Sequence, residues 1–147
     1  MAKFIYKMDN ILGIKVKMED QARTYYGIAR RRVIKEEEKL QAKMDQLEEY
    51  HHRSKELDIM KLREYTEASE SVRKEIKLQE LAVKKAEQQL EYARIKLKEA
   101  MVERKVHEKL KENAKEVFFL ETASEERKEV DELVSFRFND SNNREAG

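Results

Sequence analysis

The sequence of 147 residues contains no proline, cysteine or tryptophan, and its only glycines are Gly13, Gly27 and Gly147. Proline and glycine are the strongest helix breakers, and neither occurs between residues 28 and 146. Helix is therefore the expected structure of that stretch. Because cysteine is absent, disulfides and thiolate chemistry are excluded, which agrees with a reducing compartment.

Long hydrophobic runs are also missing. No stretch approaches the roughly 20 apolar residues that span a bilayer, and the N-terminus lacks the unbroken apolar segment of a signal peptide. The sequence therefore predicts a cytoplasmic location.

The charges nearly cancel, since the chain has 32 basic and 31 acidic side chains. No global field draws the chain to nucleic acid or to an anionic membrane. Charged residues make up 43% of the sequence, and apolar residues stand singly between them at three- and four-residue spacing. This mixture is typical of a coiled coil, in which two helices meet along a narrow apolar contact line, the seam.

Two stretches follow the alternating four-three step of such a seam, one from Ala22 to Leu57 and one from Ile76 to Ala100. If the chain reverses direction near Lys61, each residue of helix one faces a residue of helix two, and the two residue numbers add up to about 122. The predicted pairs are Leu57 with Tyr65, Tyr50 with Val72, Leu47 with Ile76, Leu40 with Val83, Val33 with Leu90, Ala29 with Ala93, Tyr26 with Leu97, Ala22 with Ala100, Leu12 with Leu110 and Ile5 with Phe118.

The predicted fold is all-α, a long two-helix antiparallel coiled coil or helical hairpin. Helix one is expected over about 5–57 and helix two, the longer, over about 59–136, in a single domain covering 1–138. Asp58 is the predicted N-cap of helix two. The polar residues 139–147 are expected to form a disordered tail.

Helix two is longer than helix one, so its C-terminal end carries apolar residues that little of helix one covers. This exposed apolar surface indicates a partner. Residues 4–8 are expected to form the first turns of helix one, with a short strand as the alternative, and the Phe4–Tyr6 segment is a second candidate cover for this end. The apolar residues of the overhang are Val117, Phe118, Phe119, Leu120, Val130, Leu133, Val134, Phe136 and Phe138.

Other clusters point to ordinary surfaces. Arg30, Arg31 and Arg32 are about 100° apart on a helix and are followed by three glutamates, so a solvated ion-pair surface is favoured over nucleic-acid binding. Glu48 and His52 have metal-ligand spacing, but two ligands on one face rarely hold zinc. No phosphate-binding loop or nucleophile motif occurs, and a two-helix hairpin offers no concave site, so neither catalysis nor a cofactor is expected.

Both ends of the sequence resemble the flagellar FliJ family. The resemblance covers nearly the whole chain, except that the middle, residues 44–63, has no distinctive match. It is carried by Phe4, Tyr6, Met8, Ile11, Leu12, Ile14, Lys15, Glu19, Asp20 and Ala22 at the start, and by Ala100 to Lys105, Glu108 to Glu112, Glu125 to Glu132 and Arg137 at the end.

The resemblance implies a stalk-like coiled coil of the flagellar type III export apparatus, similar to the central shaft of rotary ATPases. It implies three partners: the hexameric export ATPase, the cytoplasmic domain of the membrane export gate, and the export chaperones. The protein would then be peripheral to the inner face of the cell membrane at the flagellar base. The resemblance further implies that the open end is inserted into the ATPase, and we expect Phe118, Phe119, Phe136 and Phe138 to be its anchors. The family's gate-binding region corresponds to early helix two, which includes Tyr65 and Val72.

Two alternatives remain at the level of sequence. The first is a general coiled-coil adaptor, including a swapped antiparallel homodimer that makes the same seam contacts. The second is a nucleic-acid-binding helical protein that uses Arg23 and Arg30 to Arg32.

Overall fold

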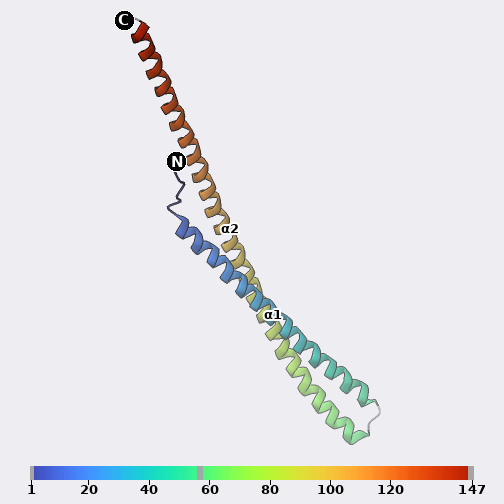
Figure 1. Ribbon diagram of the computed structural model, residues 1–147. Coiled ribbons are helices and arrows are strands. Elements are labelled where there is room, and N and C mark those ends of the chain that lie inside the picture. The colour runs from blue at the N-terminus through green and yellow to red at the C-terminus, as the bar shows by residue number, and fades with distance from the viewer. Residues whose placement is uncertain (1, 56–57, 146–147) are drawn as a thin grey trace. The chain divides into compact units, whose positions relative to one another are not determined.

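The computed structural model describes residues 2–55 and 58–145, which form two long helices (Figure 1). Helix α1 spans Asp9–Ser54, with 46 residues, and helix α2 spans Ile59–Glu145, with 87 residues. The described residues contain no strand. The predicted all-α class, with a longer second helix packed against the first as a hairpin, is therefore confirmed.

The chain divides into two compact units, and both helices contribute to each. Unit 2 comprises residues 17–101, and unit 1 comprises residues 1–16 together with 102–147. The two are described separately below. A single domain over 1–138 stays a prediction.

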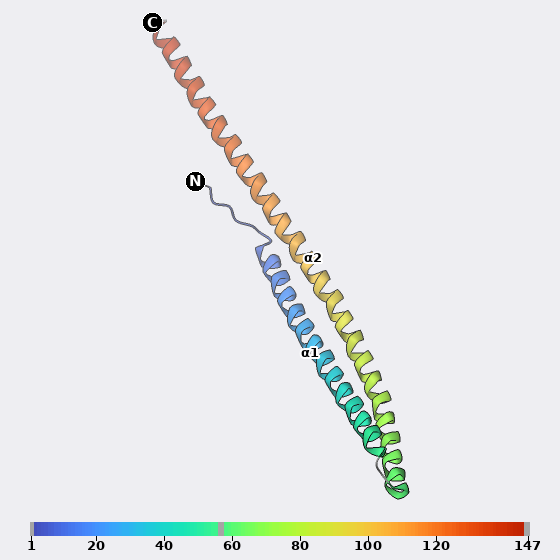
Figure 2. The same ribbon diagram turned by 90° about the vertical axis from the view of Figure 1, so that its right-hand side faces the viewer.

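Unit 2 is an antiparallel helical hairpin in which α1 and α2 lie side by side (Figure 2). Its buried residues recur at three- and four-residue steps, which places them on one face of each helix. No thick core forms, because each helix buries only this single line of side chains against the other. The buried residues of unit 2 are Glu19, Val33, Val72, Ile76, Gln79, Val83, Ala86 and Ala93.

The start of α2 is capped by Asp58. Its carboxylate oxygen Oδ1 accepts a hydrogen bond from the backbone N–H of Lys61 at 2.9 Å, and its carbonyl accepts one from Leu62 at 2.8 Å. This is the geometry of an N-cap, which satisfies a backbone donor that the first helical turn leaves free. The predicted N-cap is thus confirmed, whereas the predicted pairing of Leu57 with Tyr65 lies outside the described residues.

The beginning of unit 1 differs from expectation. Helix α1 begins at Asp9, not near residue 5, and residues 4–8 form neither the first turns of that helix nor a strand. The helical hydrogen-bond ladder starts from the carbonyl of Met8, which accepts from Leu12 at 3.1 Å. The preceding residues stay outside the ladder because their aromatic rings pack on α2 instead.

The far end of α2 also differs from expectation. The helix continues past residue 136 to Glu145, so residues 139–145 are helical where a disordered tail is expected. The physical reason is that neither proline nor glycine occurs between Gly27 and Gly147, so no helix breaker interrupts the ladder. In Figures 1 and 2 the last part of α2 runs on alone, with no other described segment beside it.

The register of unit 1 corrects two predicted pairs. Leu110 is 51% exposed and Ile5 is 77% exposed, so neither occupies the seam as predicted with Leu12 and Phe118. Lys111 and Phe118 face the N-terminal part of the chain instead, through Asp9 and Phe4. Ile5 misses Phe118 because residues 4–8 are not helical, and a non-helical segment advances along α2 at a different rise per residue. Leu110 lies off the seam because the half-buried positions of α2 step from His107 to Lys111.

Candidate partner-binding surfaces

An aromatic cluster joins the N-terminal segment, residues 2–8, to α2 within unit 1. The ring of Phe4 lies with its centroid 5.4 Å from that of Phe118 and 6.4 Å from that of Tyr6. Phe118 in turn meets Phe119 edge to face at 5.6 Å. Consecutive helical side chains point in different directions, so Phe118 turns toward the N-terminal segment while Phe119 stays 55% exposed.

Ion pairs fasten the first turns of α1 to α2 in the same unit. The Lys111 ammonium lies 2.7 Å from the Asp9 carboxylate and 6.0 Å from the centre of the Tyr6 ring. Lys15 lies 2.8 Å from Glu103, and its hydrogen bond holds the pKa of the Glu103 carboxyl below its ordinary value. These exposed contacts are individually weak, but together they fix the place of the N-terminal segment.

Beyond Thr122, which is half-buried, every described residue of α2 is exposed. We call residues 119–145 the arm. Three of the predicted anchors lie on it and are exposed, Phe119 at 55%, Phe136 at 71% and Phe138 at 65%. Closely spaced exposed apolar residues are typical of surfaces that bind a partner. The apolar residues exposed along the arm are Phe119, Leu120, Val130, Leu133, Val134, Phe136 and Phe138.

The two candidate residues on early α2 have a different environment. Val72 is only 5% exposed, and Tyr65 packs edge to face on Tyr50 at 5.6 Å, so both serve the contact between the helices of unit 2. Both residues belong to unit 2, whereas the four phenylalanines belong to unit 1. Ile59 and Met60, in the first turn of α2, are 86% and 83% exposed.

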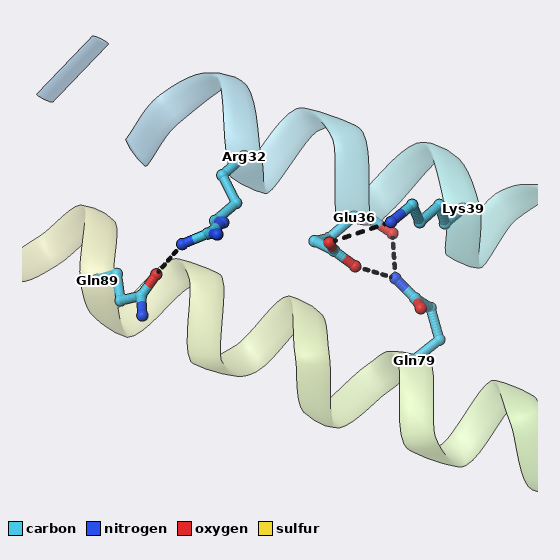
Figure 3. Close-up of polar contacts among 5 residues, drawn as sticks. All are labelled: Arg32, Glu36, Lys39, Gln79 and Gln89. Atoms are coloured by element: carbon cyan, nitrogen blue, oxygen red, sulfur yellow. Dashed lines mark hydrogen bonds and ion pairs between the residues drawn. The ribbon is translucent and has the colours of Figure 1, made fainter. Parts of the chain in front are cut away.

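A polar contact crosses the seam of unit 2 (Figure 3). The Gln79 amide donates to the backbone carbonyl of Glu36 at 3.0 Å and to its carboxylate at 2.5 Å. This hydrogen bond, followed by the nearby Lys39 and Arg32 charges, holds the pKa of the Glu36 carboxyl below its ordinary value. Arg32 also donates to the Gln89 side chain at 3.3 Å, so two polar links join the helices.

Sequence reasoning placed Glu36 and Gln79 on the seam but did not pair them. A numerical sum of about 122 assigns Glu36 to Ala86 and Gln79 to Lys43, one heptad away from the observed contact. An amide N–H and a carboxylate are complementary, but Lys43 and Ser54 are also polar positions of the seam, so the sequence alone does not single out this pair.

The remaining clusters behave as ordinary surface groups. Arg30, Arg31 and Arg32 are exposed, and two of them are engaged locally, since Arg31 donates to the Gly27 carbonyl and Arg32 to Gln89. In residues 2–55 and 58–145, no group of three or more His, Asp or Glu residues is placed to hold a metal ion. Within the same residues, no helix has an apolar stretch long enough to cross a membrane.

One comparison with known proteins identifies the family. The sequence model of the flagellar FliJ protein matches residues 4–143, nearly the whole chain. No curated protein and no solved structure matches the chain significantly. The match spans both helices of the hairpin and most of the arm. The chain therefore belongs to the flagellar FliJ family, whose members are components of the flagellar export apparatus.

Proposed function

We propose that this protein is a coiled-coil adaptor of the flagellar export apparatus that acts by binding and not by catalysis. Its partners are the hexameric export ATPase, the cytoplasmic domain of the export gate, and the export chaperones. It works in the cytoplasm and reaches the inner face of the membrane at the flagellar base only through these partners.

The observation that carries the proposal is the exposed, apolar arm. A helix that contacts no other segment needs no apolar side chains on its surface. The arm nevertheless exposes phenylalanines to solvent. Phe119, Phe136 and Phe138 are the anchors assigned to the ATPase, because large aromatic side chains concentrate binding energy when a partner encloses them. Phe118 contributes indirectly, since its contact with Phe4 positions the base of the arm.

We assign gate binding to the early part of α2, which is far from the arm in the sequence. Tyr65 and Val72 belong to this region but face α1, so they act by holding the hairpin in shape. Ile59 and Met60 supply the exposed apolar contact for the gate. Separate ends of α2 allow the ATPase and the gate to be bound at the same time, which is what an adaptor requires.

Binding to the purified export ATPase hexamer tests this function. The full chain, labelled with a fluorophore, should bind the hexamer with an affinity that the double variant Phe119→Ser/Phe136→Ser lowers by at least about tenfold. Helicity measured by circular dichroism should stay nearly unchanged, because both side chains are exposed.

A matched control variant is Leu78→Ser, which removes a 68% exposed apolar side chain from unit 2. It should bind the ATPase as the unchanged chain does. Absence of any binding by the unchanged chain, or equal affinity of the double variant, contradicts the assignment of the arm to the ATPase.

A further inference from the structure

In unit 2, the side of α2 that points away from α1 carries a second line of regularly spaced residues, which we call the outer line. Each of its members follows a buried or half-buried residue of the seam by two positions, as Leu78 follows Ile76 and Ile95 follows Ala93. A step of two residues turns a helix through about 200°, so the outer line runs opposite the seam. The outer line consists of Leu78, Leu81, Lys85, Gln88, Tyr92 and Ile95.

Four large apolar side chains of the outer line are exposed. Leu78 is 68%, Leu81 63%, Tyr92 65% and Ile95 43% exposed, so no described segment of the chain covers this face of α2. The members of the line follow one another at alternating steps of three and four residues, which is the spacing of a coiled-coil contact line. The outer line is therefore suited to a second helix.

The apolar pattern of the outer line is the same in both directions. From Leu78 to Ile95 the steps are three, four, three, four and three residues. When two copies of α2 lie antiparallel with their outer lines facing each other, Leu78 of each copy meets Ile95 of the other, and Leu81 meets Tyr92. Every apolar position thus faces an apolar position, which is the self-complementarity that a two-fold dimer interface requires.

The same alignment also matches the polar positions. One further step of four residues beyond each end of the outer line reaches Lys74 and Glu99, which carry opposite charges and face each other at both ends of the pair. Glu99 lies 3.6 Å from Lys96 on its own helix, but this exposed contact is weak. At the centre the Lys85 ammonium donates to the side-chain amide oxygen of Gln88 of the other copy.

Other alignments of two outer lines are unfavourable. In a parallel pair each residue meets its own counterpart, so Lys74 faces Lys74, Lys85 faces Lys85 and Glu99 faces Glu99, and like charges repel. Shifting the antiparallel pair by one heptad sets Leu81 against Glu99 in one direction and against Lys85 in the other. Both shifts place a charge against an apolar side chain, which disfavours them.

We propose that a second copy of this chain occupies the outer line, in an antiparallel two-fold dimer of α2 against α2. The seam stays within each copy, so this dimer differs from one in which two chains exchange helices. The inference goes beyond the adaptor function and does not depend on it.

The size of the contact predicts a weak, reversible dimer. Residues 74–99 extend over roughly 39 Å of helix, but the contact is one helix wide and polar at its centre, so it belongs to the small class of specific interfaces. We expect a dissociation constant of about 100 μM. The chain is then mainly monomeric at a few micromolar and mainly dimeric near 1 mM.

Sedimentation equilibrium of the full chain between about 5 μM and about 1 mM tests the dimer. Tyr92→Glu should raise the dissociation constant at least about tenfold, because it places a carboxylate twice in the contact. The matched control is Tyr25→Glu, since Tyr25 is 69% exposed in unit 2 but lies on α1. It should associate within about twofold of the unchanged chain. Circular dichroism should show equal helicity in both variants. A monomer at 1 mM, or equal weakening by both substitutions, overturns the inference.

Charge reversal tests the alignment. Lys74→Glu and Glu99→Lys should each raise the dissociation constant about fivefold at low salt, because each places like charges together at both ends of the dimer. The double variant Lys74→Glu/Glu99→Lys should return it to within about twofold of the original value, since the opposite charges face each other again. A double variant as weak as either single one overturns the alignment.

Cross-linking tests the direction of the two helices. The chain has no cysteine, so single cysteines can be introduced without background. Under mild oxidation, a mixture of Leu78→Cys and Ile95→Cys chains should form a disulfide between the two variants, since a disulfide requires Cα atoms within about 7 Å. Leu78→Cys alone should stay unlinked. A disulfide between two Leu78→Cys chains, or none in the mixture, overturns the antiparallel dimer.

Discussion

The Gln79 side chain reaches across the hairpin to hold both the backbone carbonyl and the carboxylate of Glu36, at 3.0 and 2.5 Å. Gln79 is 8% exposed, so this amide is a buried polar group on a mainly apolar contact line. Polar seam positions in coiled coils lower stability but select one register and one oligomeric state, because any other alignment leaves them without partners.

Replacing Gln79 with Leu should therefore raise the thermal midpoint while weakening the preference for the monomeric hairpin. The leucine gains apolar burial, but Glu36 no longer has a unique partner across the seam. Sedimentation and circular dichroism measure the two effects, with dimers expected alongside monomers. Gln88→Leu, at an exposed position of the same helix, is the control and should leave both properties unchanged. A purely monomeric Gln79→Leu variant contradicts the role in register.

The Glu36 contact also predicts a direction for the pH dependence of stability. Hydrogen bonding by Gln79 lowers the pKa of the folded Glu36 carboxyl below its ordinary 4.5, so the unfolded chain takes up this proton first as the pH falls. The contribution to stability is therefore present above about pH 4.5 and is lost below it. Thermal midpoints at neutral and acidic pH should show this loss, and the loss should be smaller in Gln79→Leu. An equal loss in both proteins contradicts the assignment.

Much of the hairpin is predictable from sequence because apolar spacing is a periodic signal that repeats over many turns. The steps through Val72, Ile76 and Val83 fall on buried positions, and Asp58 caps α2 as expected. The register is harder, since shifting one helix by a heptad preserves every apolar contact and only particular polar pairs, such as Glu36 with Gln79, reveal the alignment.

The ends of the helices are less predictable for local reasons. By composition residues 4–8 fit either a helical turn or a short strand, but Phe4 packs on Phe118 in a non-helical segment, and the sequence does not reveal such a tertiary contact. The four phenylalanines proposed as anchors occupy different environments, because adjacent positions on a helix face different ways. Composition alone places Phe118 and Phe119 together, whereas the structure shields the first and exposes the second.

Val72 provides a test of how much the seam contributes. It is 5% exposed, so Val72→Ala leaves a cavity between the helices and should lower the free energy of unfolding by about 1–3 kcal/mol. Chemical denaturation followed by circular dichroism measures this change. Leu81→Ala removes a larger side chain that is 63% exposed, and it should cost less than about 0.5 kcal/mol. Similar losses in both variants would mean that the buried line does not dominate stability.

Phe4 provides a test of the N-terminal contact. Phe4→Ala removes the ring that packs on Phe118 at 5.4 Å, an aromatic pair worth about 0.5–1.5 kcal/mol. Faster amide hydrogen exchange is expected in the first turns of α1 and around Phe118, with unit 2 unaffected. The control is Ile5→Ala, because the adjacent Ile5 side chain is 77% exposed and should leave exchange unchanged. Unchanged exchange in Phe4→Ala contradicts the packing of this segment on α2.

Asp58 tests whether the reversal of the chain depends on a single side chain. Asp58→Ala removes the acceptor of the Lys61 N–H and should lower the free energy of unfolding by about 1 kcal/mol, whereas Asp58→Ser retains an acceptor and should cost less. The turn contains neither glycine nor proline, so the Asp58 cap is the local feature that determines where α2 begins. Without it, a continuous helix through the turn becomes more accessible, and such a helix can form the seam only with another copy. Asp58→Ala should therefore also increase the dimer fraction in sedimentation, and a destabilised but wholly monomeric variant would show that seam packing, not the cap, determines the reversal.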